Sequence, residues 1–319
     1  RAHTTTTKPP TPRGGAVSAD RRRVSFDAAI DLSPGVSLLA NMIDPAALEE
    51  LGRNGWTVVS LTDEGRRATA ELFEEAGAFH SLSDRRKSFS HHARRGNTEK
   101  SGGWYRAGEE PTYTEKEPSS LVEDFCVKVE EVSGDSAIWP TEINGGKRLR
   151  AASLAYLAAM RETALSLRRG LSSLVEEAVL CEPSLDGTPS LLRMLRYPTG
   201  GDALSAHTDF EIFTFVHQRQ PGLEIFHGGA WKRLDAGASK IIILIGDVFE
   251  FWTNGATRAA RHRVRCSPEV RRESIVLFHA APHEAPLAPH KKPFCRSFLD
   301  AKSKADLHHG DDEPLTQLR

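Results

Sequence analysis

Apolar positions in the first half of the chain recur mainly at helical spacing. Asp44 followed by Pro45 is a typical helix start and predicts a short helix over 46–53. A second helix is predicted over 62–79 and a long third one over about 147–180, each with one apolar face. Because such faces must be buried against another element, we expect the helices to cover a sheet.

Strand patterns interrupt the first half and dominate the second. Runs at 56–59 and 121–129 have the aromatic and β-branched content of strands, and the aliphatic run 241–245 predicts a strand buried on both faces. From residue 191 onward, short runs alternate with turn signals, which are Pro198-Thr199-Gly200-Gly201, Gln220-Pro221-Gly222, His227-Gly228-Gly229, Asp235-Ala236-Gly237 and Thr253-Asn254-Gly255. This spacing is typical of a β-sandwich or barrel, a cupin-like jelly roll included.

Composition narrows the kinds of partner. The chain has 319 residues, of which 39% are hydrophobic and 27% charged, so it can form one large domain or two small ones. Lys and Arg number 42 against 43 Asp and Glu, and this balance gives no basic field for nucleic acid or an anionic membrane. We expect a small-molecule substrate, with no nucleic acid, membrane or obligate protein partner.

Cysteine usage and hydropathy indicate the compartment. The four cysteines are widely spaced and form no Cys-x-x-Cys pair, which argues against a disulfide framework and a structural zinc site. No apolar run approaches the roughly 20 residues of a membrane span, and no hydrophobic signal segment is present. We therefore expect a cytoplasmic protein. Residues 1–20, with four consecutive threonines and several prolines, predict a disordered tail.

A possible metal site lies within the strand-rich half. In an extended strand, the side chains of His207 and Asp209 point to the same face, so they can bind one cation together. His262 follows 53 residues after Asp209. Two histidines and one carboxylate form the facial triad that suits non-haem Fe(II), with three positions left open. Alone, a His-x-Asp tripeptide arises often by chance, and a single histidine is more often packed or solvated; the weight comes from their order and context.

Further motifs give that context. They are Arg196-Tyr197-Pro198, His207-Thr208-Asp209, Ile245-Gly246-Asp247, Trp252-Thr253-Asn254-Gly255, Arg261-His262-Arg263-Val264 and Arg272-Glu273-Ser274. In this order and spacing, the chain resembles the Fe(II)/2-oxoglutarate-dependent dioxygenases of the isopenicillin N synthase-like family over about 46–286. The resemblance implies an all-β core, a double-stranded β-helix or jelly roll with the metal inside, flanked by α-helices, hence α+β overall. It also implies one oxygenase domain over 21–319, with a helical part at about 44–180 and a jelly-roll core at about 190–285.

The resemblance implies Fe(II) as cofactor and 2-oxoglutarate and O2 as cosubstrates. Arg272 offers a planar, permanently charged fork and Ser274 a hydroxyl for the distal carboxylate of 2-oxoglutarate, and their spacing places both on one strand face. The alternative is a solvated arginine pair on an edge strand. Tyr197 matches a tyrosine that relatives have near the cosubstrate, whereas Leu195 stands where they often have Asn.

Three residues are predicted to line the substrate pocket. Phe125 matches a pocket position in relatives, although it could equally be a core aromatic. Phe278 continues the strand face of Arg272 and Ser274. Arg193 shares a face with Tyr197, which favours an anionic group on the substrate; alternatively it extends to water or pairs with a nearby Asp or Glu.

These features predict an oxidoreductase of secondary metabolism. It would couple decarboxylation of 2-oxoglutarate to hydroxylation, desaturation or cyclisation of a small, acidic metabolite. One alternative is an iron oxidase of the same family that does not use 2-oxoglutarate, and another is a non-catalytic jelly-roll binding protein. The sequence contains no phosphate-binding Gly-x-x-x-x-Gly-Lys loop and no Gly-x-Ser-x-Gly nucleophile motif.

Overall fold

The computed structural model describes residues 43–91, 102–109, 121–129, 138–140, 145–171, 190–253, 255–281, 286–287 and 292–293. The predicted tail at 1–20 lies outside these ranges, as does the end of the predicted third helix. None of the helices within them combines the length and hydropathy that a bilayer crossing requires.

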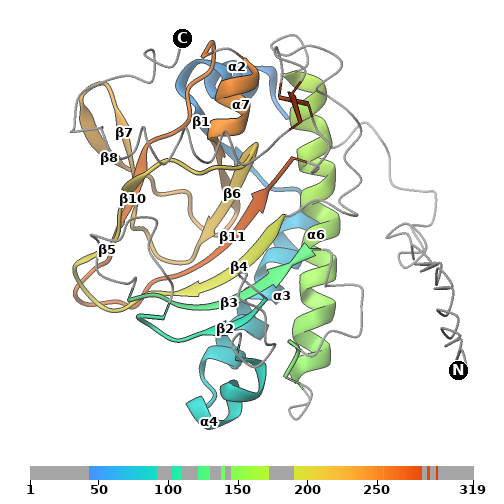
Figure 1. The fold of residues 1–319 in the computed structure, drawn as a ribbon, viewed down its shortest axis with the longest axis vertical. Coiled ribbons are helices and arrows are strands. Elements are labelled where there is room, and N and C mark those ends of the chain that lie inside the picture. The colour runs from blue at the N-terminus through green and yellow to red at the C-terminus, as the bar shows by residue number, and fades with distance from the viewer. Residues whose placement is uncertain are drawn as a thin grey trace, which may run out of the picture. The chain divides into compact units, whose positions relative to one another are not determined.

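Two antiparallel sheets form the core (Figure 1). The larger one has the strand order β1-β9-β6-β11-β4-β3-β2, and the smaller one has the order β5-β10-β7-β8. The bounds are β1 Trp56–Ser60, β2 Gly103–Tyr105, β3 Glu123–Lys128, β4 Leu191–Arg196, β5 Asp202–His207, β6 Phe213–Gln218, β7 Leu223–His227, β8 Ala230–Arg233, β9 Lys240–Ile245, β10 His262–Arg265 and β11 Glu273–His279. A short pair, β12 (Pro286–Leu287) and β13 (Lys292–Pro293), completes the described strands.

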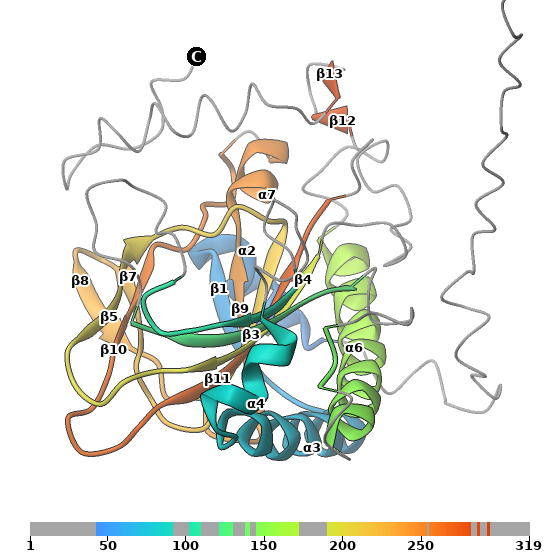
Figure 2. The ribbon, with the colours of Figure 1, turned by 60° about the horizontal axis from the view of Figure 1, so that its bottom comes forward.

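Helices cover the outer face of the larger sheet. They are α2 (Pro45–Asn54), α3 (Asp63–His80) and α6 (Gly145–Gly170). The shorter helical segments are α4 (Asp84–Lys87), η1 (Ser88–Ser90) and α7 (Asp247–Trp252). Figure 2 shows α3 and α6 next to each other beside this sheet. The predicted starts are confirmed, because the side chains of Asp44 and Thr62 accept hydrogen bonds from Ala46 N and Gly65 N.

Strand alternation separates two apolar clusters on the two faces of the larger sheet. On β9, Ile241, Ile243 and Ile245 belong to the cluster under the helices, whereas Ile242 and Leu244 belong to the cluster between the two sheets. All five are 0% exposed, which confirms the prediction of a strand buried on both faces. We call the space between the sheets the interior.

Gly55 ends α2 and lets the chain pass close to the loop that leads into β10. Its φ of 79° is left-handed, and an added Cβ would lie 2.1 Å from the carbonyl oxygen of Arg258. The carbonyl of Gly55 also accepts a 2.7 Å hydrogen bond from Ile245 N. The first predicted strand therefore joins the larger sheet beside β9.

Candidate metal and cosubstrate site

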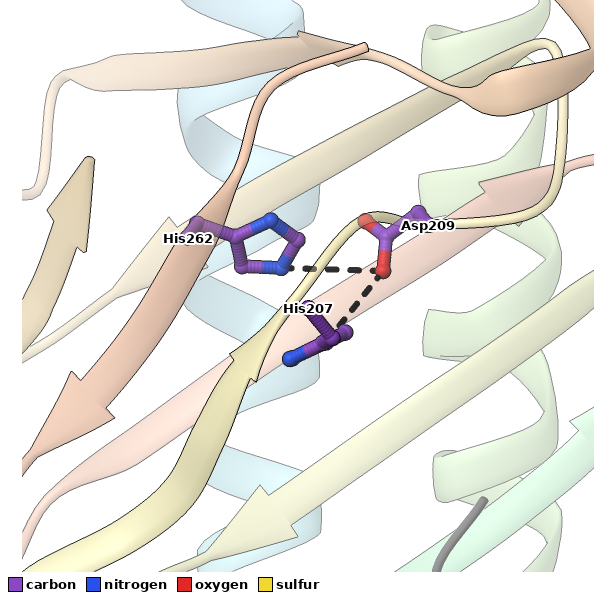
Figure 3. Close-up of side chains that lie close together, drawn as sticks. All are labelled: His207, Asp209 and His262. Carbon is purple, nitrogen blue, oxygen red and sulfur yellow. Dashed lines mark ion pairs between the residues drawn. The ribbon is translucent and has the colours of Figure 1, made fainter. Parts of the chain in front are cut away.

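The structure brings His207, Asp209 and His262 together on the interior side of the smaller sheet (Figure 3). His262 begins β10 and pairs across the ladder with His207, the last residue of β5. Each histidine places Nε2 3.6 Å from Asp209 Oδ1, and one ligand atom from each residue lies within 4.8 Å of the others. Because β5 ends at His207, Asp209 lies in the turn after the strand, not on the strand as predicted.

The orientation of both imidazole rings is fixed by backbone carbonyls. Nδ1 of His207 lies 2.8 Å from Ser205 O, and Nδ1 of His262 lies 2.9 Å from Ala260 O. A carbonyl can only accept, so each Nδ1 carries a hydrogen, and each Nε2 lies on the side of Asp209, where it can bind a metal once deprotonated. Two imidazole nitrogens and one carboxylate oxygen on one side of a centre are a donor set that fits Fe(II).

Neighbouring charge favours the ionised form of Asp209 although the carboxyl is buried. Burial alone would raise the pKa of this carboxyl, but the neighbouring rings of His262 and His207 outweigh it and hold the pKa well below its ordinary value. His207 is about a quarter exposed, whereas the side chains of Asp209 and His262 are nearly covered. The His-Asp-His group is thus buried at Asp209 and His262 and partly open to solvent at His207.

Two hydrogen bonds with the backbone at or near the ligands hold them in place. The carbonyl of Asp209 accepts a 2.8 Å hydrogen bond from Asp247 N, and Gly246 leaves room for this approach, since a Cβ there would lie 2.0 Å from Glu211 O. On the other side, buried Glu250 accepts a 2.7 Å hydrogen bond from Ala259 N, three residues before His262. These contacts explain structurally the Ile245-Gly246-Asp247 motif.

Arg272 is a buried cation one residue before β11. It is 1% exposed and donates to Ser274 Oγ at 3.1 Å and Gln218 Oε1 at 3.2 Å, with its guanidinium 4.4 Å from the Tyr197 ring centre. Among the described residues, no carboxylate lies within ion-pair distance of it. A buried guanidinium without an anion is costly, so this position fits an anionic ligand.

The three residues predicted to bind the cosubstrate lie together. Ser274 Oγ is 3.5 Å from the Tyr197 hydroxyl, and both side chains are buried. The alternative of a solvated arginine on an edge strand is wrong, because β11 lies between β6 and β4 inside the larger sheet.

The substrate-pocket predictions have different outcomes. Phe278 is partly buried and packs against the interior cluster, and Arg193 lies on the interior face of β4. Arg193 already has an acidic partner, however, since Nε and Nη2 each lie 2.9 Å from Asp124 Oδ2. The side chain of Asp124 is only 1% exposed.

The prediction that Phe125 lines the pocket is corrected. Phe125 lies in the cluster under the helices, 4.5 Å from Phe79 and 5.9 Å from Trp139 between ring centres. Alternation on β3 instead turns Asp124 and Cys126 to the opposite face. Sequence reasoning missed Asp124, although its odd-even relation to Phe125 was a usable signal. It also missed Gln218. The only hint in the sequence was that Gln218 lies two residues after Val216 on β6 and therefore shares its strand face.

Residues 189–281 match the family described as the 2OG-Fe(II) oxygenase superfamily. Residues 189–281 therefore correspond to a 2OG-Fe(II) oxygenase domain. Gibberellin 2-beta-dioxygenase 8 of Arabidopsis thaliana is 29% identical over 191 residues, which are 58% of this chain and 54% of the relative. Leucoanthocyanidin dioxygenase of Petunia hybrida is 32% identical over 162 residues (47% and 36%), and gibberellin 2-beta-dioxygenase 5 of rice is 35% identical over 95 residues (27% and 28%). The chain thus spans about half or less of the length of these relatives, which are consistent with the resemblance stated above.

Solved structures of similar fold include further oxygenases. A 2OG-Fe(II) oxygenase family protein of Caulobacter crescentus superposes with a TM-score of 0.61 at 21% identity, covering 82% of this chain and 94% of the other. The dioxygenase for auxin oxidation 1 of Arabidopsis thaliana, solved with 2-oxoglutarate, gives a TM-score of 0.57 at 18% identity, covering 76% and 91%. These similarities confirm the jelly-roll fold of the oxygenase domain.

Proposed function

We propose that this chain is an Fe(II)/2-oxoglutarate-dependent dioxygenase that oxidises a small organic metabolite. The observation that carries the proposal is Arg272, a fully buried cation that faces the same interior as the His-Asp-His group and has no carboxylate near it among the described residues. A 2-oxo acid with a distal carboxylate has one end suited to a metal held by the His-Asp-His group and another end suited to Arg272. Its 2-oxo end would bind the iron, and its carboxylate would pair with the guanidinium of Arg272.

The proposed roles follow from the donor atoms. His207, Asp209 and His262 would hold Fe(II), which supplies the oxygen chemistry when bound. Arg272 and Ser274 would bind the distal carboxylate, and Tyr197 would cover the guanidinium and orient the hydroxyl of Ser274. The buried surroundings strengthen these charge-assisted bonds and keep water away from them.

Two rival functions lose support from the same geometry. An iron oxidase that does not use 2-oxoglutarate would need another anion to neutralise the buried Arg272. A non-catalytic jelly-roll protein with a structural metal would be expected to enclose its ion with more protein ligands. Only three candidate ligands converge here among the described residues, with His207 partly exposed.

The substrate class is the least constrained part of the proposal. Arg193 and Phe278 remain our candidates for substrate contact, within a single oxygenase domain over 21–319. Because Asp124 already pairs with Arg193, the alternative stated for Arg193 explains its environment without an acidic substrate. Replacing Arg193 with Gln should raise the Michaelis constant for an acidic substrate and leave that for 2-oxoglutarate unchanged; an unchanged constant for the true substrate would remove Arg193 from the pocket.

Succinate release tests the function. The purified chain with Fe(II), O2 and 2-oxoglutarate would be screened against small metabolites, both acidic and neutral, for stimulated succinate formation. We expect at least one metabolite to raise succinate release, and His262→Ala to abolish the rise. Oxidation of a metabolite without consumption of 2-oxoglutarate would favour the first rival instead.

A cytoplasmic location without nucleic-acid, membrane or obligate protein partners also belongs to the proposal. The wide spacing of the four cysteines, with no Cys-x-x-Cys pair, supports a reducing compartment. Because Cys126 and Cys266 are buried, the test is alkylation under denaturing conditions at the moment of lysis: it should label all four cysteines, whereas a pair that reacts only after reduction would argue for an oxidising compartment.

A further inference from the structure

Gln218 connects Arg272 to the smaller sheet through both ends of its amide. It is the last residue of β6 and lies opposite Ser274 in the ladder, and it is 2% exposed. Its Oε1 accepts from Arg272 Nη2 at 3.2 Å, and its Nε2 donates to the carbonyl of Leu234 at 2.7 Å. Because that carbonyl can only accept, the amide cannot be turned around, and its oxygen must face Arg272.

This contact orients the guanidinium without cancelling its charge. An amide oxygen offers a hydrogen bond, whereas a carboxylate of the same shape would form an ion pair. The other contacts of Arg272 are also with neutral groups, the Ser274 hydroxyl and the Tyr197 ring. The orientation of the Arg272 guanidinium is therefore fixed, while its charge remains available to an anionic ligand.

We propose that Gln218 is a positioning residue that sets cosubstrate specificity. It holds Arg272 toward the interior and, by being neutral, reserves that arginine for the distal carboxylate of 2-oxoglutarate. This inference rests on the proposed function, in which Arg272 binds that carboxylate. Gln218 itself touches neither the metal ligands nor, in this proposal, the cosubstrate.

The test replaces the amide by a carboxylate of nearly identical shape. Anaerobic, Fe(II)-loaded Gln218→Glu would be titrated by calorimetry with 2-oxoglutarate and, separately, with oxalate, which has a chelating end but no distal arm. The new carboxylate competes for Arg272 and also loses the hydrogen bond to the Leu234 carbonyl, so 2-oxoglutarate should bind at least about 30-fold more weakly, given measured couplings between close charge pairs. Affinities for oxalate and Fe(II) should stay within about threefold, a range well below the effect of losing a metal's outer-shell partner.

Two further variants separate positioning from a structural role. Gln220→Glu is the matched control, since Gln220 Oε1 accepts from Glu273 N at 2.8 Å and a carboxylate can still do so; it should bind 2-oxoglutarate like the parent. Gln218→Leu removes the acceptor from Arg272 and should weaken 2-oxoglutarate about fivefold, the effect of one hydrogen bond, with oxalate unchanged. A structural role alone would lower the melting temperature and leave the ratio of the two affinities at the parent's value.

The outcomes separate the inference about Gln218 from the proposed function of Arg272 on which it rests. If Gln218→Glu keeps the parent's affinity for 2-oxoglutarate while Arg272→Leu loses it, the role of Gln218 is overturned and the function of Arg272 stands. If Arg272→Leu also keeps that affinity, both are overturned. Should Gln218→Glu fail to fold, Gln218→Leu decides, and parent-like affinities for both ligands in that variant reject the inference.

Discussion

Gly222 lies against the side chain of Arg272 with no room for a methyl group. An added Cβ at Gly222 would be 2.7 Å from Arg272 Cδ and 3.0 Å from Nε, with the carbonyl oxygen of Arg265 2.9 Å away. The arginine stem cannot keep its path if this space is filled, because contacts this short force a shift. The missing side chain at residue 222 is thus part of what places Arg272.

Gly222→Ala should therefore weaken 2-oxoglutarate binding by about tenfold or more, because the displaced guanidinium of Arg272 loses part of its charge-assisted contact with the distal carboxylate. Fe(II) binding should not change. Gly77→Ala is a matched control, because a Cβ at Gly77 meets nothing within 4 Å and alanine favours the helix. Calorimetry with 2-oxoglutarate checks the prediction, and equal affinities in parent and Gly222→Ala would refute it.

Arg272→Leu should raise the apparent requirement for 2-oxoglutarate far more than that for the other substrate. The distal carboxylate would lose its cation in a buried site, which costs about 2–5 kcal/mol. Arg263→Leu provides the control, since Arg263 pairs with Glu224 on β7, away from the three groups around Arg272. Michaelis constants for both substrates decide the matter, and equal increases would argue that Arg272 has no special relation to 2-oxoglutarate.

Arg193→Gln should destabilise the fold by about 3–5 kcal/mol, because it leaves the buried carboxylate of Asp124 without its cation. The double variant Arg193→Gln with Asp124→Asn removes both charges and should recover most of this loss. Urea unfolding of the two variants and the parent measures the difference. A double variant as unstable as the single one would mean that charge pairing is not the cause.

Acid should destabilise the protein through His217 and His279. Burial lowers the pKa of His217 from 6.5 to about 3, and burial with the nearby charge of Arg168 lowers that of His279 from 6.5 to about 4. Below about pH 6.5 the unfolded chain takes up protons that the folded chain does not, so stability falls as pH falls toward these values. Above pH 6.5 both states are neutral, and the two residues add no pH dependence.

His217→Leu should flatten this pH dependence. Between pH 6 and 4 the free energy of unfolding should fall less steeply, by up to about 1.4 kcal/mol per pH unit, the effect of one proton. Unfolding curves across this range test it. His227→Leu serves as the comparison, because His227 is half-buried near Trp56, whereas His217 is 2% exposed. The same slope in His217→Leu and parent would show that His217 does not cause the acid sensitivity.

Local rules predicted much of the fold from the sequence. The capping residues Asp44 and Thr62 begin α2 and α3 as expected, and the aliphatic run of β9 is buried on both faces. Alternation along β4 and β11 placed Tyr197 and Ser274 on one face, where their side chains meet. These properties depend on neighbours within a few residues, which a sequence displays directly.

The contacts that the sequence did not predict depend on pairings between strands that are far apart in the chain. Whether Asp124 or Phe125 faces the interior is set by the register of β3 against β4, and the Asp124 carboxylate meets a residue 69 positions away. Gln218 reaches Arg272 only because β6 pairs with β11, 54 positions later. No local pattern specifies such partners, so the neutral environment of Arg272 became visible only in the structure.

An anaerobic titration with Fe(II) and then 2-oxoglutarate tests the central claim most directly. The parent should bind one Fe(II) per chain and then one 2-oxoglutarate per iron. His262→Ala should remain folded by circular dichroism but bind Fe(II) at least about 100-fold more weakly, since losing a ligand exceeds the 10–100-fold effect of losing an outer partner. His227→Ala should behave as the parent. A His262→Ala protein that binds Fe(II) and 2-oxoglutarate with the parent's affinities would contradict the assignment of this site.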